Sequence, residues 1–255
     1  MARYRAVVEY DGTDLLGFQR QATGRTVQGE LEAALVRIGW MGTVGTHAAG
    51  ARGGVLGAGR TDTGVHAAGQ VIAFDFDWQH GEGDLARALN ANLPGDIAIK
   101  SLAGCAGMFH PRFDARGRRY RYTLYNQPVR SPLAARFAWQ VWPALDLEML
   151  RAGGAVLLGR HDFAAFGSDP EHGRSTVRTL SLAEWQAAPG GWLTFDVQAE
   201  AFLFRMVRSL VGALKRVGAG ELAVEQLQAI LASGDRAQCP PIAPAQGLCL
   251  MEVIY

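Results

Sequence analysis

Stretches with the two-residue alternation of a β-strand recur along the whole chain, and stretches with helical spacing separate them into small groups. Because strands and helices do not alternate one by one, the pattern argues against a parallel sheet built from βαβ units. It predicts the α+β class, with antiparallel sheets and with helices packed on one side. The expected strands are residues 4–10, 70–77, 97–102, 118–125, 177–185, 192–200 and 248–255, and the expected helices are 27–38, 84–92, 147–158, 202–217 and 224–231.

The 255-residue length allows one large domain or two lobes of ordinary size. A run of small residues, Gly104-Cys105-Ala106-Gly107, follows an expected strand and predicts a seam there. We therefore expect residues 1–107 to form an N-terminal lobe and residues 108–255 to form a C-terminal lobe.

No run of the chain approaches the roughly eighteen apolar residues of a membrane span. The N-terminal residues lead straight into an expected strand rather than into the apolar segment of a signal peptide. We therefore expect a cytoplasmic protein. The three cysteines are widely spaced and lack a CxxC pair, so they suggest neither a disulfide framework nor a zinc site.

The net charge of +1 argues against a uniformly basic nucleic-acid-binding protein, but the basic residues are unevenly distributed. Five arginines occur between Arg112 and Arg121 with a single acid, Asp114, and every basic residue of the chain except Lys100 and Lys215 is an arginine. Arginine pairs with phosphates in a forked geometry and stacks on bases. The distribution is compatible with a nucleic-acid partner that contacts one face of the protein.

The stretch Gly57-Ala58-Gly59-Arg60-Thr61-Asp62-Thr63-Gly64-Val65-His66-Ala67 places one carboxylate between two hydroxyl side chains. Small residues on both flanks let another molecule approach closely. In an extended chain Arg60 and Asp62 lie on the same face, and a guanidinium beside a carboxylate favours the ionised carboxylate. Two interpretations follow: an anionic nucleophile or base on a loop, or a Gly-rich surface turn with a solvated Asp.

The sequence lacks the common motifs of several enzyme classes: the GxSxG elbow, the HExxH zinc motif, the GxxxxGK[ST] phosphate loop and the GxGxxG dinucleotide motif. Asp62-Thr63-Gly64 matches the Asp-Thr-Gly core of aspartic proteases, whose chemistry needs two carboxylates that share a proton. This chain has one such tripeptide, and Arg60-Thr61 precedes it where apolar residues are expected. A protease would require a dimer of a chain this long, so we rank that interpretation last.

Several motifs, in order along nearly the whole chain, together resemble the tRNA pseudouridine synthase A family. The most specific is the Gly-Arg-Thr-Asp-x-Gly-Val-His signature, which begins at Gly59. The other matching stretches are Glu9-Tyr10-Asp11-Gly12, Gly17-Phe18-Gln19-Arg20-Gln21, Asn92-Leu93-Pro94-Gly95-Asp96, Arg118-Arg119-Tyr120-Arg121-Tyr122 and Met206-Val207-Arg208.

The resemblance implies isomerisation of uridine to pseudouridine at positions 38, 39 and 40 of the tRNA anticodon stem-loop, by a homodimer without a cofactor or a metal. It also implies two related α+β lobes that share a central antiparallel sheet flanked by helices, with the catalytic cleft between the lobes. The reaction changes no oxidation state and needs no energy input, which agrees with the lack of nucleotide and redox motifs in the sequence.

By the same resemblance Asp62, in the N-terminal lobe, is the catalytic carboxylate, and Tyr120 packs on the flipped uracil and is a candidate to assist proton removal from C5. Arg208 matches the arginine that pairs with the catalytic Asp, and Arg60 matches the arginine associated with holding the stem open. Whether the carboxylate attacks C1′ or C6, or removes a sugar proton, stays open. The residues expected to bind RNA by charge are Arg20, Arg118, Arg119, Arg121 and Arg205.

Two features depart from the family pattern. Phe18 stands where the family has Trp, and Leu15-Leu16 stand where aromatic residues are common. The stretch Gly42–Gly59 is unusually long and rich in glycine, and we expect a loop or hairpin that leads into the Asp62 motif. A rival interpretation from another class is an RNA-binding scaffold without activity, which would use the same basic clusters.

Overall fold

The computed structural model describes residues 1–42, 54–168 and 175–255. By its internal contacts the chain divides into two compact units, Met1–Arg116 with Leu250–Tyr255, and Gly117–Cys249. Most of the stretch predicted to be a loop or hairpin before the Asp62 motif lies outside the described residues.

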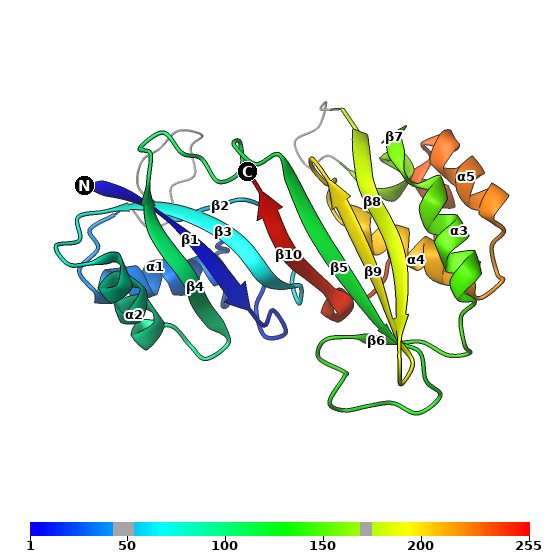
Figure 1. Cartoon of the computed structure of the whole chain (residues 1–255), viewed down its shortest axis with the longest axis horizontal. Helices are drawn as coiled ribbons and strands as arrows, with labels where there is room; N and C mark the ends of the chain where they lie inside the picture. Colours follow the sequence, from blue (N-terminus) through cyan, green and yellow to red (C-terminus); the bar gives the residue numbers. More distant parts are fainter. Residues whose placement is uncertain (43–53, 169–174) are drawn as a thin grey trace. The chain divides into compact units, whose positions relative to one another are not determined.

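The first unit is built from a sheet and two helices (Figure 1). Its elements are β1 (Ala2–Tyr10), α1 (Val27–Arg37), β2 (Leu56–Gly57), β3 (His66–Phe76), α2 (Glu82–Asn92), β4 (Ile97–Cys105) and β10 (Leu248–Ile254). The strand order is β4-β1-β3-β10, and β2 pairs with β3. Strand β1 runs antiparallel to both of its neighbours, and its alternate side chains Tyr4, Ala6, Val8 and Tyr10 are buried.

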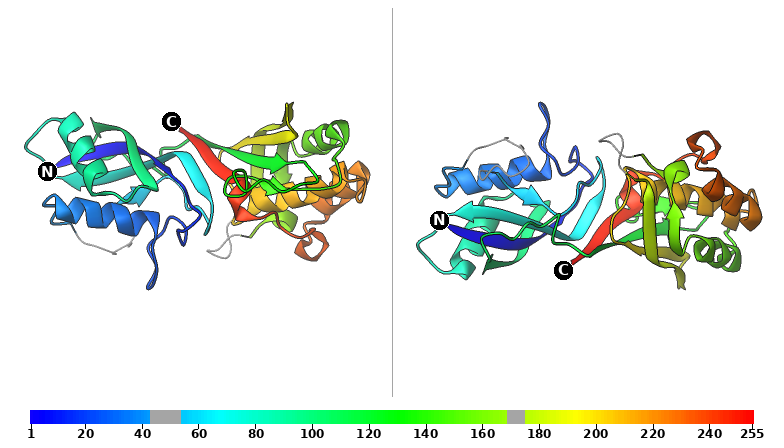
Figure 2. Two further views of the ribbon diagram at one scale, coloured as in Figure 1. Left: turned by 90° about the horizontal axis from the view of Figure 1, so that it is seen from below. Right: turned by 90° about the horizontal axis from the view of Figure 1, so that it is seen from above.

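The second unit contains the remaining strands and three helices. Its elements are β5 (Gly117–Tyr125), β6 (Trp139–Gln140), α3 (Leu147–Val156), β7 (Gly159–Asp162), β8 (Val177–Ala188), β9 (Trp192–Ala199), α4 (Met206–Gly218) and α5 (Val224–Ser233). Strands β5, β9, β8 and β7 are antiparallel neighbours in that order, and β6 pairs parallel with β5. Helices α3, α4 and α5 pack together (Figure 1 and Figure 2).

The predicted α+β class is confirmed, because mostly antiparallel strands are flanked by five helices within the described parts of the chain. The sharing of one sheet by two related lobes, and a cleft between them, depend on how the units are placed and stay predictions. No helix in the described residues has the length and apolar character needed to cross a bilayer.

The compact units differ from the expected lobes at both ends of the second lobe. Residues 108–116 and the C-terminal strand from Leu250 onward belong to the first unit. Tyr255 donates its hydroxyl hydrogen bond to Pro111 O (2.7 Å), and Arg116 N donates to Ile254 O (2.8 Å). These bonds join two segments that are far apart in sequence. The amino-acid composition of the two segments gives no sign of this contact.

Strand β3 begins at His66, earlier than the expected start at Gln70, because Ala67 already pairs with Tyr10 of β1. The small residues at its start hide the strand pattern from sequence, and both of its faces are largely buried. The strand therefore begins directly after the segment that carries Asp62.

Helix α4 begins at Met206, not at Phe202 as expected. Arg205 precedes it with φ 59° and ψ 10°, a left-handed conformation that cannot continue a right-handed helix. Phe202 fits the helical spacing of the apolar residues in α4, but the backbone at Arg205 separates Phe202 from that helix.

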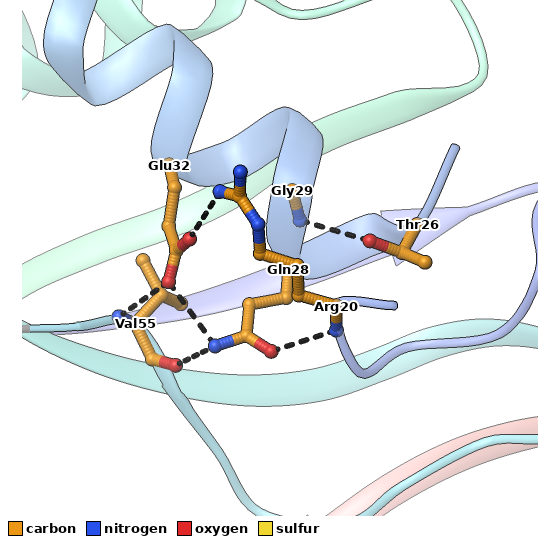
Figure 3. A network of polar contacts seen from close by, with 6 residues as sticks. All are labelled: Arg20, Thr26, Gln28, Gly29, Glu32 and Val55. Carbon is orange, nitrogen blue, oxygen red and sulfur yellow. Dashed lines mark hydrogen bonds and ion pairs between the residues drawn. The ribbon is translucent and has the colours of Figure 1, made fainter. Parts of the chain in front are cut away.

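Thr26 is the N-cap of α1. Thr26 has an extended backbone, and its Oγ1 accepts a hydrogen bond from Gly29 N at 3.2 Å (Figure 3). We expect Thr26→Ala to lower the free energy of unfolding by about 1 kcal/mol, because the partly buried Gly29 amide loses its acceptor, whereas Thr26→Ser keeps it. Urea unfolding of both variants checks this, and equal losses would show that the methyl group, not the cap, matters.

Candidate active site

Asp62 lies in a tight turn between β2 and β3. Val65 N donates to Asp62 O at 3.1 Å, and Gly64 adopts φ 78°, a left-handed conformation that glycine accepts without strain. The Asp62 side chain is half-buried, and its neighbours Arg60 and Thr63 are exposed. The structure therefore places the carboxylate at a position that is both supported by the protein and accessible from solvent.

The residue before Asp62 is anchored in the core of the first unit. Thr61 is 7% exposed, and its Oγ1 lies 2.8 Å from the Tyr10 hydroxyl. The amide nitrogen of Gln70, on β3, donates to Gly59 O at 2.8 Å and lies 3.4 Å from the same hydroxyl. Sequence reasoning missed Thr61 and Gln70 as supports, because only the fold brings β1 and β3 against the loop.

A second segment, residues 11–21, packs its backbone against the Asp62 turn. A Cβ at Gly12 would lie 2.1 Å from Val65 O, and a Cβ at Gly17 would lie 2.6 Å from Thr61 O. Gly17 also has φ 88°. Both positions therefore require glycine, because a side chain would push the two backbones apart.

Hydrogen bonds reinforce this contact. Phe18 N donates to Thr61 O at 3.1 Å, and Gly64 N donates to Leu15 O at 3.3 Å. Phe18 is buried, and its ring occupies the space beside Gly57. Residues 11–21, which we call the wall, thus line the Asp62 turn, and the Phe18 side chain is buried.

His66 contacts the first two residues of the same segment, Asp11 and Gly12. Its Nδ1 lies 3.0 Å from Gly12 N and 3.2 Å from an Asp11 carboxylate oxygen, and the imidazole is buried. The last residue of the Gly-Arg-Thr-Asp-x-Gly-Val-His signature therefore has a structural contact, with the Asp-Gly turn that ends β1.

Tyr120 lies on β5 of the second unit, on the buried face that it shares with Tyr122 and Leu124. It is 8% exposed, and its ring meets the Phe202 ring edge-on at a centroid distance of 5.2 Å. This packing fixes the plane of the Tyr120 ring.

Arg208 lies on α4, and the segment after α5 holds it. Its Nε donates to Ala243 O at 2.8 Å, and its own carbonyl oxygen accepts from Ala243 N at 2.9 Å. The Tyr122 hydroxyl donates to Pro244 O at 2.8 Å. Burial raises the pKa of Tyr122 well above its usual range, and the nearby positive charge of Arg208 opposes this rise. Tyr122 therefore stays a protonated donor that supports the segment carrying Ala243.

Two arginines of the predicted RNA-binding set have partners within the second unit. Arg118 is buried and donates to Glu200 O at 2.7 Å. Arg121 makes a forked pair with Asp196, with its Nη2 2.9 Å from Oδ2 and its Nε 3.1 Å from Oδ1. Asp196 itself is buried, so this arginine compensates a carboxylate inside the protein.

The other predicted arginines reach solvent to different extents. Arg60 and Arg205 are exposed, and Arg119 is half-buried on the face of β5 opposite Tyr120. The Arg205 guanidinium lies 4.8 Å from the centre of the Phe204 ring, at the first turn of α4. The Arg20 side chain is 44% exposed and pairs with Glu32 at 3.2 Å.

The structure thus gathers the predicted residues into two groups, one in each unit. The first unit holds Asp62 and Arg60 with the wall that carries Arg20. The second holds Tyr120, Arg208 and the remaining arginines. Among the residues the structure describes, no group of three or more His, Cys, Asp or Glu side chains is arranged to hold a metal ion.

Comparisons with known proteins test the resemblance seen in the motifs. A family model described as tRNA pseudouridine synthase matches residues 6–114 and 155–255. The tRNA pseudouridine synthase A of Syntrophotalea carbinolica is 42% identical over 100% of this chain and 97% of its own length. The proteins of the same name from Pseudothermotoga lettingae and Myxococcus xanthus are 39% and 40% identical, again over 100% of this chain and over 100% and 92% of their own lengths. The resemblance is confirmed, and the chain belongs to the tRNA pseudouridine synthase family, whose members are isomerases.

Proposed function

We propose that this protein converts uridine to pseudouridine at positions 38, 39 and 40 of the tRNA anticodon stem-loop, with Asp62 as the catalytic carboxylate. The observation that carries the proposal is the support given to Asp62. Hydrogen bonds and close backbone contacts join its turn to β1, to β3 and to residues 11–21, yet Asp62 is only partly buried. A preorganised, reachable carboxylate is what this isomerisation needs.

The chemistry requires few groups. The C1′–N1 bond breaks, the uracil turns over, a C1′–C5 bond forms, and the proton on C5 is removed while N1 gains one. Atoms and electrons balance without an external reactant. Asp62 acts either as a nucleophile at C1′ or C6 or as a base toward the sugar.

Tyr120 and Arg208 complete the proposed site. Tyr120 offers an aromatic face whose plane Phe202 fixes, which suits the stacking of an extruded base. The Nε of Arg208 is bound to Ala243 O, so its terminal nitrogens are the part of the guanidinium that we assign to pairing with Asp62. This pairing would favour the ionised carboxylate.

For RNA binding we assign the arginines that reach solvent: Arg20, Arg60, Arg119 and Arg205. Their contacts would be with phosphates, which position the RNA without reading its sequence. Arg121 also reaches solvent, with a side chain that is 40% exposed, so it belongs to this set although it pairs with Asp196. Arg118 is buried and donates to Glu200 O, so we assign it a structural role in the second unit.

We further propose that the protein acts as a homodimer in the cytoplasm. Support for a dimer comes from residues 129–142 of the second unit, where four large apolar side chains are exposed: Val129, Leu133, Phe137 and Trp142. Exposed apolar side chains gathered in one segment are typical of a protein–protein contact.

Asp62→Asn should reduce pseudouridine formation on the order of 10⁴-fold or more, because an amide can act neither as the nucleophile nor as the base. Binding of tRNA should be preserved, since the arginines remain. The measurement is incubation with unmodified tRNA without additives, followed by a carbodiimide-based pseudouridine assay and a binding titration. Turnover at the wild-type rate would remove Asp62 from the mechanism, and binding without product in the wild type would favour the scaffold.

Tyr120→Phe should slow turnover about 10²-fold, because the ring still packs on the base but the hydroxyl that assists proton removal is lost. The affinity for tRNA should change little. Tyr125→Phe is the matched control, since Tyr125 lies on the same strand but on its other face. If Tyr120→Phe and the control both turn over normally, Tyr120 is a packing residue only.

Gly17→Ala should reduce activity, because a Cβ 2.6 Å from Thr61 O would displace the Asp62 turn. The backbone strain of a left-handed alanine, roughly 1 kcal/mol, must be separated from this effect. Gly39→Ala provides the control, since Gly39 has φ 95° but no atom near its added Cβ. Turnover rates and melting temperatures are compared, and equal turnover in the two variants would contradict the role of the wall.

A further inference from the structure

The first turns of α1 carry a polar network that has no role in the proposed reaction so far (Figure 3). The Glu32 side chain is completely buried. Its carboxylate accepts hydrogen bonds from Arg20 Nη1 at 3.2 Å, from Gln28 Nε2 at 3.1 Å and from Val55 N at 3.4 Å. These donors come from the wall, from α1 itself and from the residue before β2. A buried carboxylate is tolerated only where such donors surround it.

Gln28 binds the same two neighbouring segments a second time. Its Oε1 accepts from Arg20 N at 3.0 Å, and its Nε2 donates to Val55 O at 3.0 Å. Gln28 is also buried. Glu32 and Gln28 together therefore fix the end of the wall and the entry to β2 against one helix.

The network connects to Asp62 through Phe18. The Phe18 carbonyl oxygen accepts from Gln28 N at 2.9 Å, and its N–H donates to Thr61 O at 3.1 Å. A shift of the wall relative to α1 would therefore move the residue next to Asp62. In the same way Glu32 determines where the half-exposed Arg20 guanidinium lies.

We propose that Glu32 is a positioning residue for the isomerisation. It holds the Asp62 turn in place through the wall, and it holds Arg20 where an RNA phosphate can reach it. The proposal rests on the proposed function, in which Asp62 is the catalytic carboxylate. Glu32 does not contact the substrate, and its effect is exerted through Arg20, Gln28 and the wall.

Glu32→Gln tests this with little change in volume. Within the described residues, the hydrogen-bond partners of the carboxylate, Arg20, Gln28 and Val55, are all donors. An amide brings its own two donors, so in either orientation its nitrogen faces another donor. The network must then rearrange, although the side chain still fits.

The experiment measures the single-turnover rate constant with saturating enzyme and the tRNA dissociation constant, well below the melting temperature of each variant. We expect Glu32→Gln to lower the single-turnover rate by about 10- to 100-fold, because the catalytic group is misplaced. Glu30→Gln is the matched control, since Glu30 lies on the same helix but pairs with the exposed Arg25. It should keep the wild-type rate.

Arg20→Met provides a second test at a half-exposed position, in case Glu32→Gln does not fold. If Arg20 only bound a phosphate, saturating enzyme would restore the full rate. We expect a slowed rate at saturation instead, and a double variant no slower than the slower single variant, because the network acts as a unit.

A folded Glu32→Gln variant with the wild-type single-turnover rate would overturn the inference, and so would a wild-type rate of Arg20→Met at saturation if Glu32→Gln does not fold. Failure of the proposed function gives a different result, namely an active Asp62→Asn variant. Loss of activity in Asp62→Asn together with full activity in Glu32→Gln removes the inference alone.

Discussion

The close approach of two backbone segments is the constraint on which the reactive turn depends. Gly12 and Gly17 let residues 11–21 contact the backbone around Asp62. A Cβ at either position would collide with a backbone oxygen of the Asp62 turn. Backbone hydrogen bonds between the two segments then hold the loop that carries Asp62 in place, as ladder hydrogen bonds hold a strand in a sheet. Rigid placement limits the reorganisation that a reaction must otherwise supply, which is why such a turn suits catalysis.

The arginines of this protein divide according to burial, and the division follows from the cost of an unpaired charge. Arg121 balances the buried Asp196, and Arg118 satisfies a carbonyl of the second unit. Arg20 and Arg121 combine the two situations, since each guanidinium meets a buried carboxylate while much of the side chain faces solvent. An arginine-rich sequence therefore does not translate directly into an RNA-binding surface.

The sequence predicted more of the elements than of their contacts. The alternation over 118–125 places Tyr120 and Tyr122 on one buried face, as the structure shows, because strand side chains follow a fixed period of two. The start of β3 at His66 escaped prediction, since its first residues are small and their pairing with β1 is a long-range contact. The start of α4 was wrong because one left-handed residue, Arg205, overrides a good helical pattern.

The α+β class, the family and the candidate carboxylate follow from the sequence alone, because periodicity and a specific signature around Asp62 are local properties of the chain. The groups that support that carboxylate are known only from the folded structure. Thr61, Gln70 and Glu32 are ordinary polar residues in sequence, and they gain their roles from partners on other strands and loops. Burial removes water as an alternative partner, so these long-range hydrogen bonds become obligatory once the chain has folded.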